Sequence, residues 1–221
     1  MTDLFPNLDS QELLQALWET IIMVGISTVF TALIGLPLGI LVVLTSKGNL
    51  MQNRPFFYVL SFIINVLRSV PFIILMITMI PVTKWIVGTS IGVAAAIPPL
   101  VVGSAPFFAR LVEVSLREVD RGVIEMAQSA GATTWQIIRR VLLPEARPGI
   151  IAGITITLVA LVGYSAMSGV IGGGGLGDLA LRYGYQRFQT DVMVVTTAVM
   201  ILLVQLFQTF GDLLVRRFTK R

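Results

Sequence analysis

Glu125 to Pro144, EMAQSAGATTWQIIRRVLLP, is the longest cytoplasm-like stretch in a chain whose remaining segments are mostly apolar. Good helix formers lead up to Gly131, which predicts a helix stop, because only glycine adopts the left-handed cap conformation without a Cβ penalty. Thr133 favours the N-cap of a second short helix that Pro144 is expected to end. We expect this helix to have an apolar face, formed by Trp135, Ile138 and Leu142. Its opposite, polar face is expected to carry Gln136, Arg139 and Arg140. The stretch predicts an amphipathic helix–glycine–helix hairpin that is too polar to span lipid.

The composition around this hairpin is that of a membrane protein. Apolar types make up 55% of the 221 residues and charged types only 13%, whereas soluble domains carry about 25% charged residues. The chain has no Cys and no His. Disulfides, thiol nucleophiles and the commonest transition-metal ligands are therefore excluded, and we expect no metal or cofactor on this chain.

Five apolar segments have the length that a bilayer requires. The second is interrupted by the sequence RSVP at 68–71. The third contains Pro98, Pro99 and Pro106, which predict a helix broken or bent at membrane depth. The predicted spans are 18–45, 56–82, 89–111, 149–170 and 192–215, with the hairpin loop at 121–144. We expect an all-α integral membrane protein with five spans in a single domain, 1–221. The first seventeen residues lack the basic start of a secretory signal peptide.

The distribution of basic residues predicts the orientation. Twelve of the sixteen Lys and Arg fall on the side of the hairpin and the C-terminus, three fall on the other side, and Arg68 lies within a span. Cytoplasmic loops are the ones enriched in Lys and Arg. The sequence therefore predicts an N-terminus outside and a cytoplasmic C-terminus. The net charge of +4 is explained by this asymmetry, and no nucleic-acid partner is expected.

Arg68 is the one charge that the predicted spans place deep in the membrane. A central Arg costs about 2.5–3.5 kcal/mol on insertion scales, so it should face protein or water. It could bind a substrate carboxylate, or pair with a carboxylate such as Glu19 across the bundle. Alternatively, the span boundary is misplaced and Arg68 reaches an interface.

Two further stretches have a functional and a structural interpretation. Tyr164, Met167 and Ser168 share a helical face in the fourth span and suit a narrow, partly polar passage, or else ordinary helix packing. The run IGGGGLG at 171–177 could suggest a phosphate-binding loop. It lacks the preceding strand and the Lys-Ser/Thr ending of such loops, so we expect a flexible external turn.

The hairpin resembles the EAA loop of the membrane subunits of ABC-type importers. Met126 and Val141 depart from that pattern but keep apolar side chains, and the matching positions are Glu125, Ala127, Gly131, Leu143 and Pro144. In that family the loop docks on the ATPase subunit and transmits its closure, so the resemblance assigns ATPase coupling to these five residues. The alternative is an amphipathic interfacial hairpin without a partner.

Beyond the hairpin, the order of motifs resembles the methionine branch of that family. The stretches are RSVPF at 68–72, VGTSIG at 87–92, APFFAR at 105–110, TLVALVGYSAM at 157–167 and the glycine-rich run. The resemblance implies a homodimer in the bacterial inner membrane and two ATPase subunits that bind ATP and Mg. It also implies a periplasmic or lipid-anchored binding protein that delivers L- or D-methionine. It places Tyr164 and Met167 near the dimer axis at a gate, to which we add Ser168 and Arg68.

Three other functions are weighed against methionine import. The permease could move another amino acid, because substrate choice can lie largely in the binding protein. A membrane-embedded enzyme is disfavoured by the absence of His, Cys and paired acids within the predicted spans. A channel would not need an ATPase-docking loop.

Overall fold

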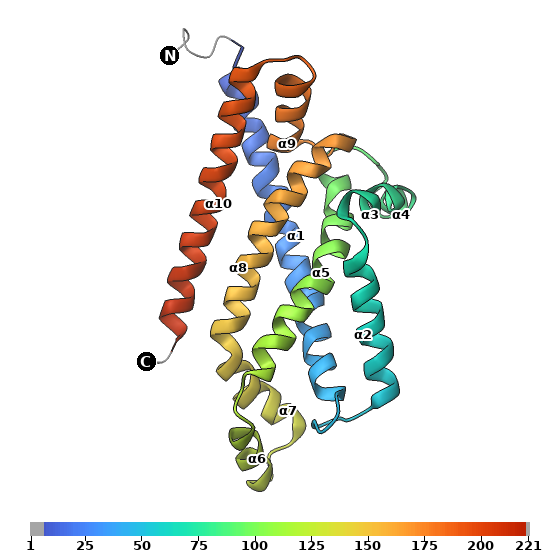
Figure 1. Cartoon of the computed structure of the whole chain (residues 1–221), viewed down its shortest axis with the longest axis vertical. Coiled ribbons are helices and arrows are strands. Elements are labelled where there is room, and N and C mark those ends of the chain that lie inside the picture. Colours follow the sequence, from blue (N-terminus) through green and yellow to red (C-terminus); the bar gives the residue numbers. More distant parts are fainter. Residues whose placement is uncertain (1–6, 220–221) are drawn as a thin grey trace.

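The computed structural model of the chain describes residues 7–219, which contain helices and no strand (Figure 1). Lys220 and Arg221, two of the basic residues assigned to the cytoplasmic side, lie outside this range. Long helices form the body of the molecule: α1 (Ser10–Thr45), α5 (Val93–Arg117), α8 (Leu143–Ser168) and α10 (Thr190–Phe218), with the shorter α2 (Arg54–Ser69) alongside. The remaining α-helices are short: α3 (Phe72–Thr78), α4 (Ile80–Val87), α6 (Arg121–Ser129), α7 (Thr134–Ile137) and α9 (Gly175–Leu179).

The centre of the bundle is the contact between α1 and α5. A Cβ atom added at Gly35 would lie 2.8 Å from the carbonyl oxygen of Ala105, and one at Gly39 would lie 2.6 Å from that of Ala109. Glycine thus lets the two backbones approach closely, as small residues do in membrane helix pairs. A hydrogen bond of 2.8 Å between the buried hydroxyls of Thr31 and Ser104 joins the same helices.

Within residues 7–219, four helical stretches are long and apolar enough to cross a membrane: α1, α5, 134–171 and α10. A fifth span exists only if α2 and α3, which meet at 100°, are taken together. The segment expected to span from 56 to 82 is therefore divided into separate helices, with a break at the RSVP sequence as predicted. Proline disfavours the helical conformation of the residue before it, and Val70 is extended (φ −77°, ψ 124°) in front of Pro71.

The three prolines of the third span do not break it, so of the two expected outcomes, a break or a bend, the break is wrong. Pro98, Pro99 and Pro106 all lie inside the uninterrupted helix α5. Proline in a membrane helix is tolerated where neighbouring helices cover the carbonyls that lose their donors. α5 meets this condition, because 61% of an apolar 18-residue stretch of this helix is buried inside the bundle.

The glycine-rich run is not a flexible turn, so that expectation is also wrong. Leu176 is fully buried. Its backbone N–H donates to the Thr20 hydroxyl at 2.9 Å, and the N–H of Gly175 donates to Glu19 Oε2 at 2.8 Å. A Cβ atom at Gly177 would overlap the backbone of Ala166 on α8. The glycines therefore allow this segment to pack between α1 and α8.

The chain continues as helix beyond this segment rather than as a polar loop. A π-helical turn covers Ala180–Tyr185 directly after α9. The Tyr183 hydroxyl donates to Glu12 Oε1 of α1 at 2.7 Å. This hydrogen bond raises the pKa of Tyr183 above its ordinary value of 10.0. The N-terminal part of α1 is thus bonded to both the glycine-rich run and the turn that follows it.

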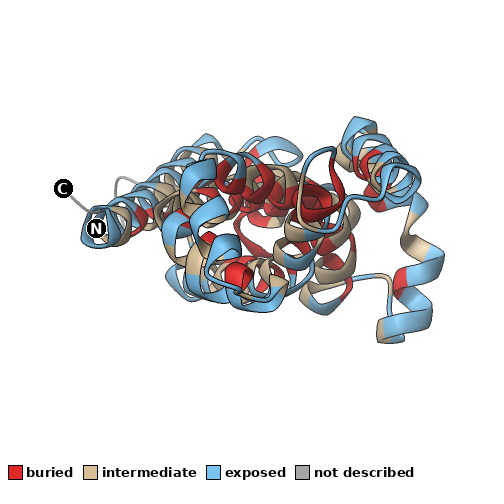
Figure 2. Cartoon of the chain, turned by 90° about the horizontal axis from the view of Figure 1, so that it is seen from below, coloured by how far each residue is buried: buried red, intermediate tan, exposed pale blue. Residues whose placement is uncertain are grey.

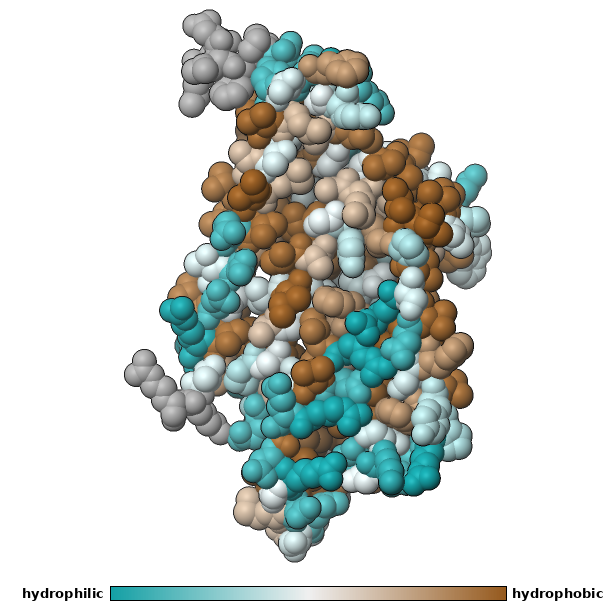
Figure 3. Space-filling view, in the orientation of Figure 1, coloured by the Kyte–Doolittle hydropathy of each residue, from teal (hydrophilic) through white to brown (hydrophobic). Residues whose placement is uncertain are grey.

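Buried residues concentrate where α1, α5 and α8 meet, and the outlying helices are mostly exposed (Figure 2). Large apolar side chains on the outside include Phe62 of α2 and Leu206 of α10, which are 68% and 67% exposed. Hydrophilic residues gather at the end that carries α6 and α7 (Figure 3). An exposed apolar surface of this extent is typical of contact with lipid or a partner chain.

Candidate functional site

The first part of the hairpin ends as its sequence predicts. Gly131 has φ +77°, the left-handed conformation in which glycine carries no Cβ penalty. Its N–H donates to Gln128 O at 2.9 Å, and the N–H of Ala132 donates to Ala127 O at 3.1 Å. These two bonds form a Schellman motif, which satisfies the last carbonyls of α6. The prediction of a glycine stop is confirmed.

The second part of the hairpin begins as predicted but does not end at Pro144. Thr133 and Gln136 form a capping box at the start of α7, which confirms the predicted N-cap. A π-helical turn, Ile138–Leu142, then leads into α8 without a break. Leu143 N–H bonds Ile138 O, five residues back, and Pro144 occupies the first turn of α8. The helix thus runs on through Pro144, so the expectation that Pro144 ends it is wrong.

One face of the hairpin packs on the bundle and the other is open. Ile137, Ile138 and Leu142 are buried in a cluster that includes Val43 of α1 and Phe108 of α5. Trp135 was expected on this buried face, but it is 67% exposed. A π-helical turn follows α7 directly, so the α-helical period that grouped Trp135 with Ile138 and Leu142 does not hold across it.

The five EAA-like positions divide between these faces. Ala127 and Leu143 pack against the buried cluster, and Pro144 is half-buried. Glu125 and Gly131 are exposed, beside Met126 at 66% exposure. Large exposed apolar side chains at the polar end of a membrane protein are suited to a protein interface.

A second candidate site is a cavity of about 130 Å³ between α2, α3, α5 and α8. The structure brings Arg68 and Tyr164 together in its lining. The Tyr164 ring stacks on that of Phe72, with centroids 4.5 Å apart and planes 15° apart. The rest of the lining is apolar or glycine: Leu67, Val70, Leu75, Gly103 and Phe107. A cation at one wall and aromatic rings at another suit a small molecule with a carboxylate and an apolar part.

Arg68 lies in the last turn of α2 and is exposed. It therefore lies at the break between α2 and α3, the two helices that together would form the fifth span. None of the three ion pairs within residues 7–219 involves it. The pairing with Glu19 is wrong, because Glu19 accepts hydrogen bonds from Gly175 N and Gln15 Nε2.

Met167 and Ser168 do not share an environment. Met167 is 47% exposed, whereas Ser168 is fully buried against α1. The Ser168 hydroxyl lies 2.6 Å from Ser165 O and 3.4 Å from the Met23 sulfur. Neither residue lines the cavity that holds Tyr164. Of these two residues, only Met167 is exposed in the single chain and can contact a partner.

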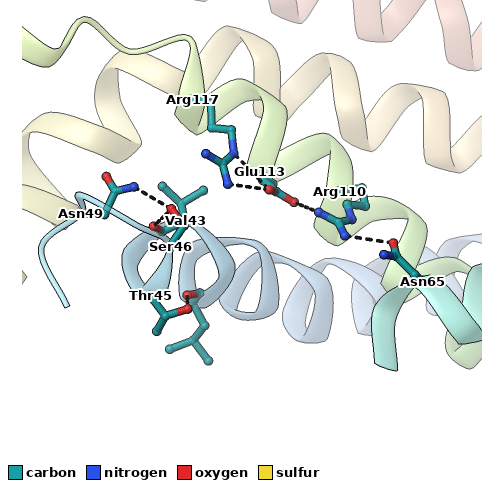
Figure 4. Close-up of polar contacts among 9 residues, drawn as sticks. Val43, Thr45, Ser46, Asn49, Asn65, Arg110, Glu113 and Arg117 are labelled. Carbon is teal, nitrogen blue, oxygen red and sulfur yellow. Dashed lines mark hydrogen bonds and ion pairs between the residues drawn. The ribbon is translucent and has the colours of Figure 1, made fainter. Parts of the chain in front are cut away.

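Sequence reasoning missed a buried charge cluster on α5 (Figure 4). The Glu113 side chain is only 8% exposed and pairs with Arg110 and, at 2.9 Å, with Arg117. Arg110 Nη2 donates to Asn65 Oδ1 of α2 at 2.9 Å. The third span was predicted to end at 111, which placed Glu113 in a loop. The available signal was the spacing of Arg110, Glu113 and Arg117, which puts the three on one helical face.

This architecture, an all-helical membrane bundle with an amphipathic hairpin at its polar end, is that of an importer's membrane subunit. Residues 35–221 match the family described as binding-protein-dependent transport system inner membrane component, and the chain belongs to that family. The predicted resemblance to ABC importer permeases and the predicted bacterial inner-membrane location are thereby confirmed.

Three comparisons narrow the likeness to one branch. The chain is 53% identical, over 97% of its length and 95% of the relative's, to the probable D-methionine transport system permease protein MetI of Vibrio cholerae. It is 50% identical, over 98% of both chains, to the methionine import system permease protein MetP of Bacillus subtilis. A solved structure of inward-facing conformations of the MetNI methionine ABC transporter has a TM-score of 0.95 and 47% identity, covering 96% of this chain and all of that one.

Proposed function

We propose that two copies of this chain form the pathway by which methionine, as either enantiomer, crosses the bacterial inner membrane. The main support for this proposal is the 50–53% sequence identity to methionine permeases over nearly the whole chain. A binding protein delivers the amino acid, and two separate ATPase subunits bind ATP and Mg and drive the cycle. This chain carries no catalytic residue of its own in that scheme.

The hairpin is the part that couples the pathway to the ATPase. Glu125 and Gly131 are exposed, and the exposed Met126 and Trp135 offer an apolar contact to a partner. Ala127, Leu143 and Pro144 hold the hairpin on the bundle. The exposed docking surface thus belongs to a hairpin whose opposite face packs against α1 and α5.

Arg68, Tyr164 and Met167 serve the pathway itself. The Arg68 guanidinium binds the carboxylate of the amino acid, since it lines the same cavity as Tyr164 and has no carboxylate partner among residues 7–219. Phe72 and Tyr164 supply an apolar wall for the thioether side chain. Met167, at 47% exposure near the end of α8, faces the second copy as a gate. Ser168 is buried and supports the end of α8 rather than lining the gate.

The test is uptake of labelled L- and D-methionine into proteoliposomes that contain the permease, its ATPase and its binding protein. Uptake should require both ATP and the binding protein, and omission of either should abolish it. Uptake of a different amino acid in place of methionine would assign another substrate. Uptake without ATP would indicate a channel and contradict the proposal.

A further inference from the structure

Beyond the Arg68 cavity, α2 and α5 are joined at a second guanidinium, that of Arg110. On α5, Gly103 and Phe107 line the cavity, and Arg110 follows at the spacing that keeps all three on one face. On α2, Asn65 precedes Arg68 by three residues, about 4.5 Å along the helix axis. The hydrogen bond between Arg110 and Asn65 therefore lies about one helical turn beyond the cavity.

The charges around Arg110 leave an excess of one positive charge. Glu113 is a single carboxylate shared by two guanidinium groups, those of Arg110 and Arg117. The Arg110 side chain is 22% exposed, and the amide oxygen that accepts from its Nη2 belongs to an exposed, neutral residue, Asn65. Arg110 is thus fixed on one side by a buried carboxylate and bonded on the other side by a neutral group.

A carboxylate would compete well with the Asn65 amide for this position. The Asn65 amide offers the guanidinium one neutral oxygen, whereas a carboxylate carries a negative charge and can accept two parallel N–H bonds from it. The exchange would also remove a hydrogen bond that joins α2 to α5. Binding at Arg110 and the position of α2 are therefore linked.

We propose that Arg110 is a second binding residue for the carboxylate of the transported amino acid, which passes to it from Arg68 and displaces Asn65. This inference rests on the proposed function for the nature of the substrate. In this scheme α2 is held against α5 while the site is empty and is released when the substrate arrives.

The Asn65→Asp substitution separates this role from a purely structural one. It places a carboxylate of the protein itself next to Arg110. If the hydrogen bond only packs α2 on α5, the charged version strengthens it and leaves transport intact. If Arg110 must receive the substrate carboxylate, the built-in carboxylate competes with it and inhibits transport without impairing folding.

The experiment measures uptake of labelled L-methionine by the complete complex in proteoliposomes. We expect Asn65→Asp to lower uptake at least tenfold, with the amount of assembled complex and its melting temperature maintained. Asn65→Leu removes the acceptor but leaves Arg110 open, so its uptake should stay within about threefold of wild type. Asn53→Asp makes the same chemical change at the N-cap of α2, where Asp caps as well as Asn, and should behave as wild type.

Two results would overturn the inference. One is wild-type uptake by Asn65→Asp, and the other is an equal loss of uptake in Asn65→Leu, which would show that the hydrogen bond itself is needed. A wild-type complex that takes up another amino acid instead of methionine would refute only the proposed substrate. The same three variants, assayed with that amino acid, would still decide the role of Arg110.

Discussion

Gly131 and Thr133 are the residues at which local sequence alone determines the structure. The left-handed glycine and the capping box need no partner elsewhere in the chain, so their pattern was sufficient to predict them. Trp135, two residues further on, was assigned to the wrong face, because its exposure depends on how the hairpin docks on the bundle. Local signals therefore predicted how the hairpin turns and that Ile138 and Leu142 are buried, but not that Trp135 is exposed.

Gly131→Val should uncouple the hairpin from the ATPase. A β-branched residue at φ +77° carries backbone strain of about 1–3 kcal/mol, which the hairpin would relieve by changing the angle between α6 and α7. Copurification of the ATPase and substrate-stimulated ATP hydrolysis should both decrease. Gly131→Asn is the matched control, because Asn tolerates the left-handed conformation. Normal assembly and uptake in the Val variant would contradict the coupling role.

Met167→Cys should form a disulfide with its symmetry mate when the gate is shut, because a residue at a two-fold axis faces its own copy. Oxidation should then stop uptake, and reduction should restore it. Ser168→Cys is the control: that position is fully buried inside one chain and should not cross-link. Met167→Ala should leak substrate, since the flexible thioether fills gaps that Ala leaves open. Absence of both the cross-link and the leak would make Met167 a packing residue.

At the scale of elements, the glycine-rich segment differs most from its sequence-based interpretation. Its backbone donates to Glu19 and Thr20, which are 156 residues away in the chain. No local sequence pattern predicts a contact between residues so far apart, and glycine runs usually indicate flexible turns. The same holds for α5, whose three prolines are accommodated by neighbouring helices that the local sequence does not reveal.

Gly177→Ala should destabilise the permease, because the added Cβ would overlap the Ala166 backbone. Overpacking of this kind typically costs about 1–3 kcal/mol. The expected result is a lower melting temperature of the purified protein in detergent. Gly163→Ala, whose Cβ would meet nothing within 4 Å, should leave the melting temperature unchanged. Equal stability of the two variants would show that the segment is not packed as described.

Ionisation of Tyr183 should lower the stability of the folded protein at alkaline pH. Its hydrogen bond to Glu12 raises its pKa above 10.0 in the folded state, so the protonated phenol is the form that folding favours. The contribution is fully present below the unfolded pKa and disappears as the pH rises through the folded pKa. Melting temperatures of wild type and Tyr183→Phe should differ at about pH 8 and converge as the pH rises through the raised pKa of Tyr183 in the folded state. A constant difference across that range would exclude the Tyr183 proton as the cause.

At the scale of the whole molecule, the sequence was enough for the class of protein and for most of the helical segments, since apolar stretches of bilayer length are strong signals. The sequence did not indicate which distant helices pack against each other. Arg68 and Tyr164 were both singled out, yet only the fold shows that they line one cavity. Arg110 and Asn65, 45 residues apart, were not suspected of meeting.

The predicted orientation can be tested by labelling single cysteines in a chain that has none of its own. Asp9→Cys and Gln186→Cys should react with an impermeant thiol reagent outside intact cells, and Gln128→Cys should react only after lysis. Gln186 is preferable to Gly174 on the same side, because Gly174 has φ +79° and its Cβ would lie 2.8 Å from Glu19 Oε2. Labelling of Gln128→Cys from outside would reverse the orientation.

The unbroken helical stretch from residue 134 to residue 171 has a mechanical consequence. From Trp135 in the hairpin to Met167 near its other end, this stretch is about 48 Å long at 1.5 Å per residue. As a stiff lever hinged at the hairpin, it would displace Met167 by about 4 Å for a tilt of only about 5°. That displacement is comparable to the width of a side chain. If the hairpin contacts the ATPase as proposed, a small rotation there would produce a much larger displacement at the far end of α8.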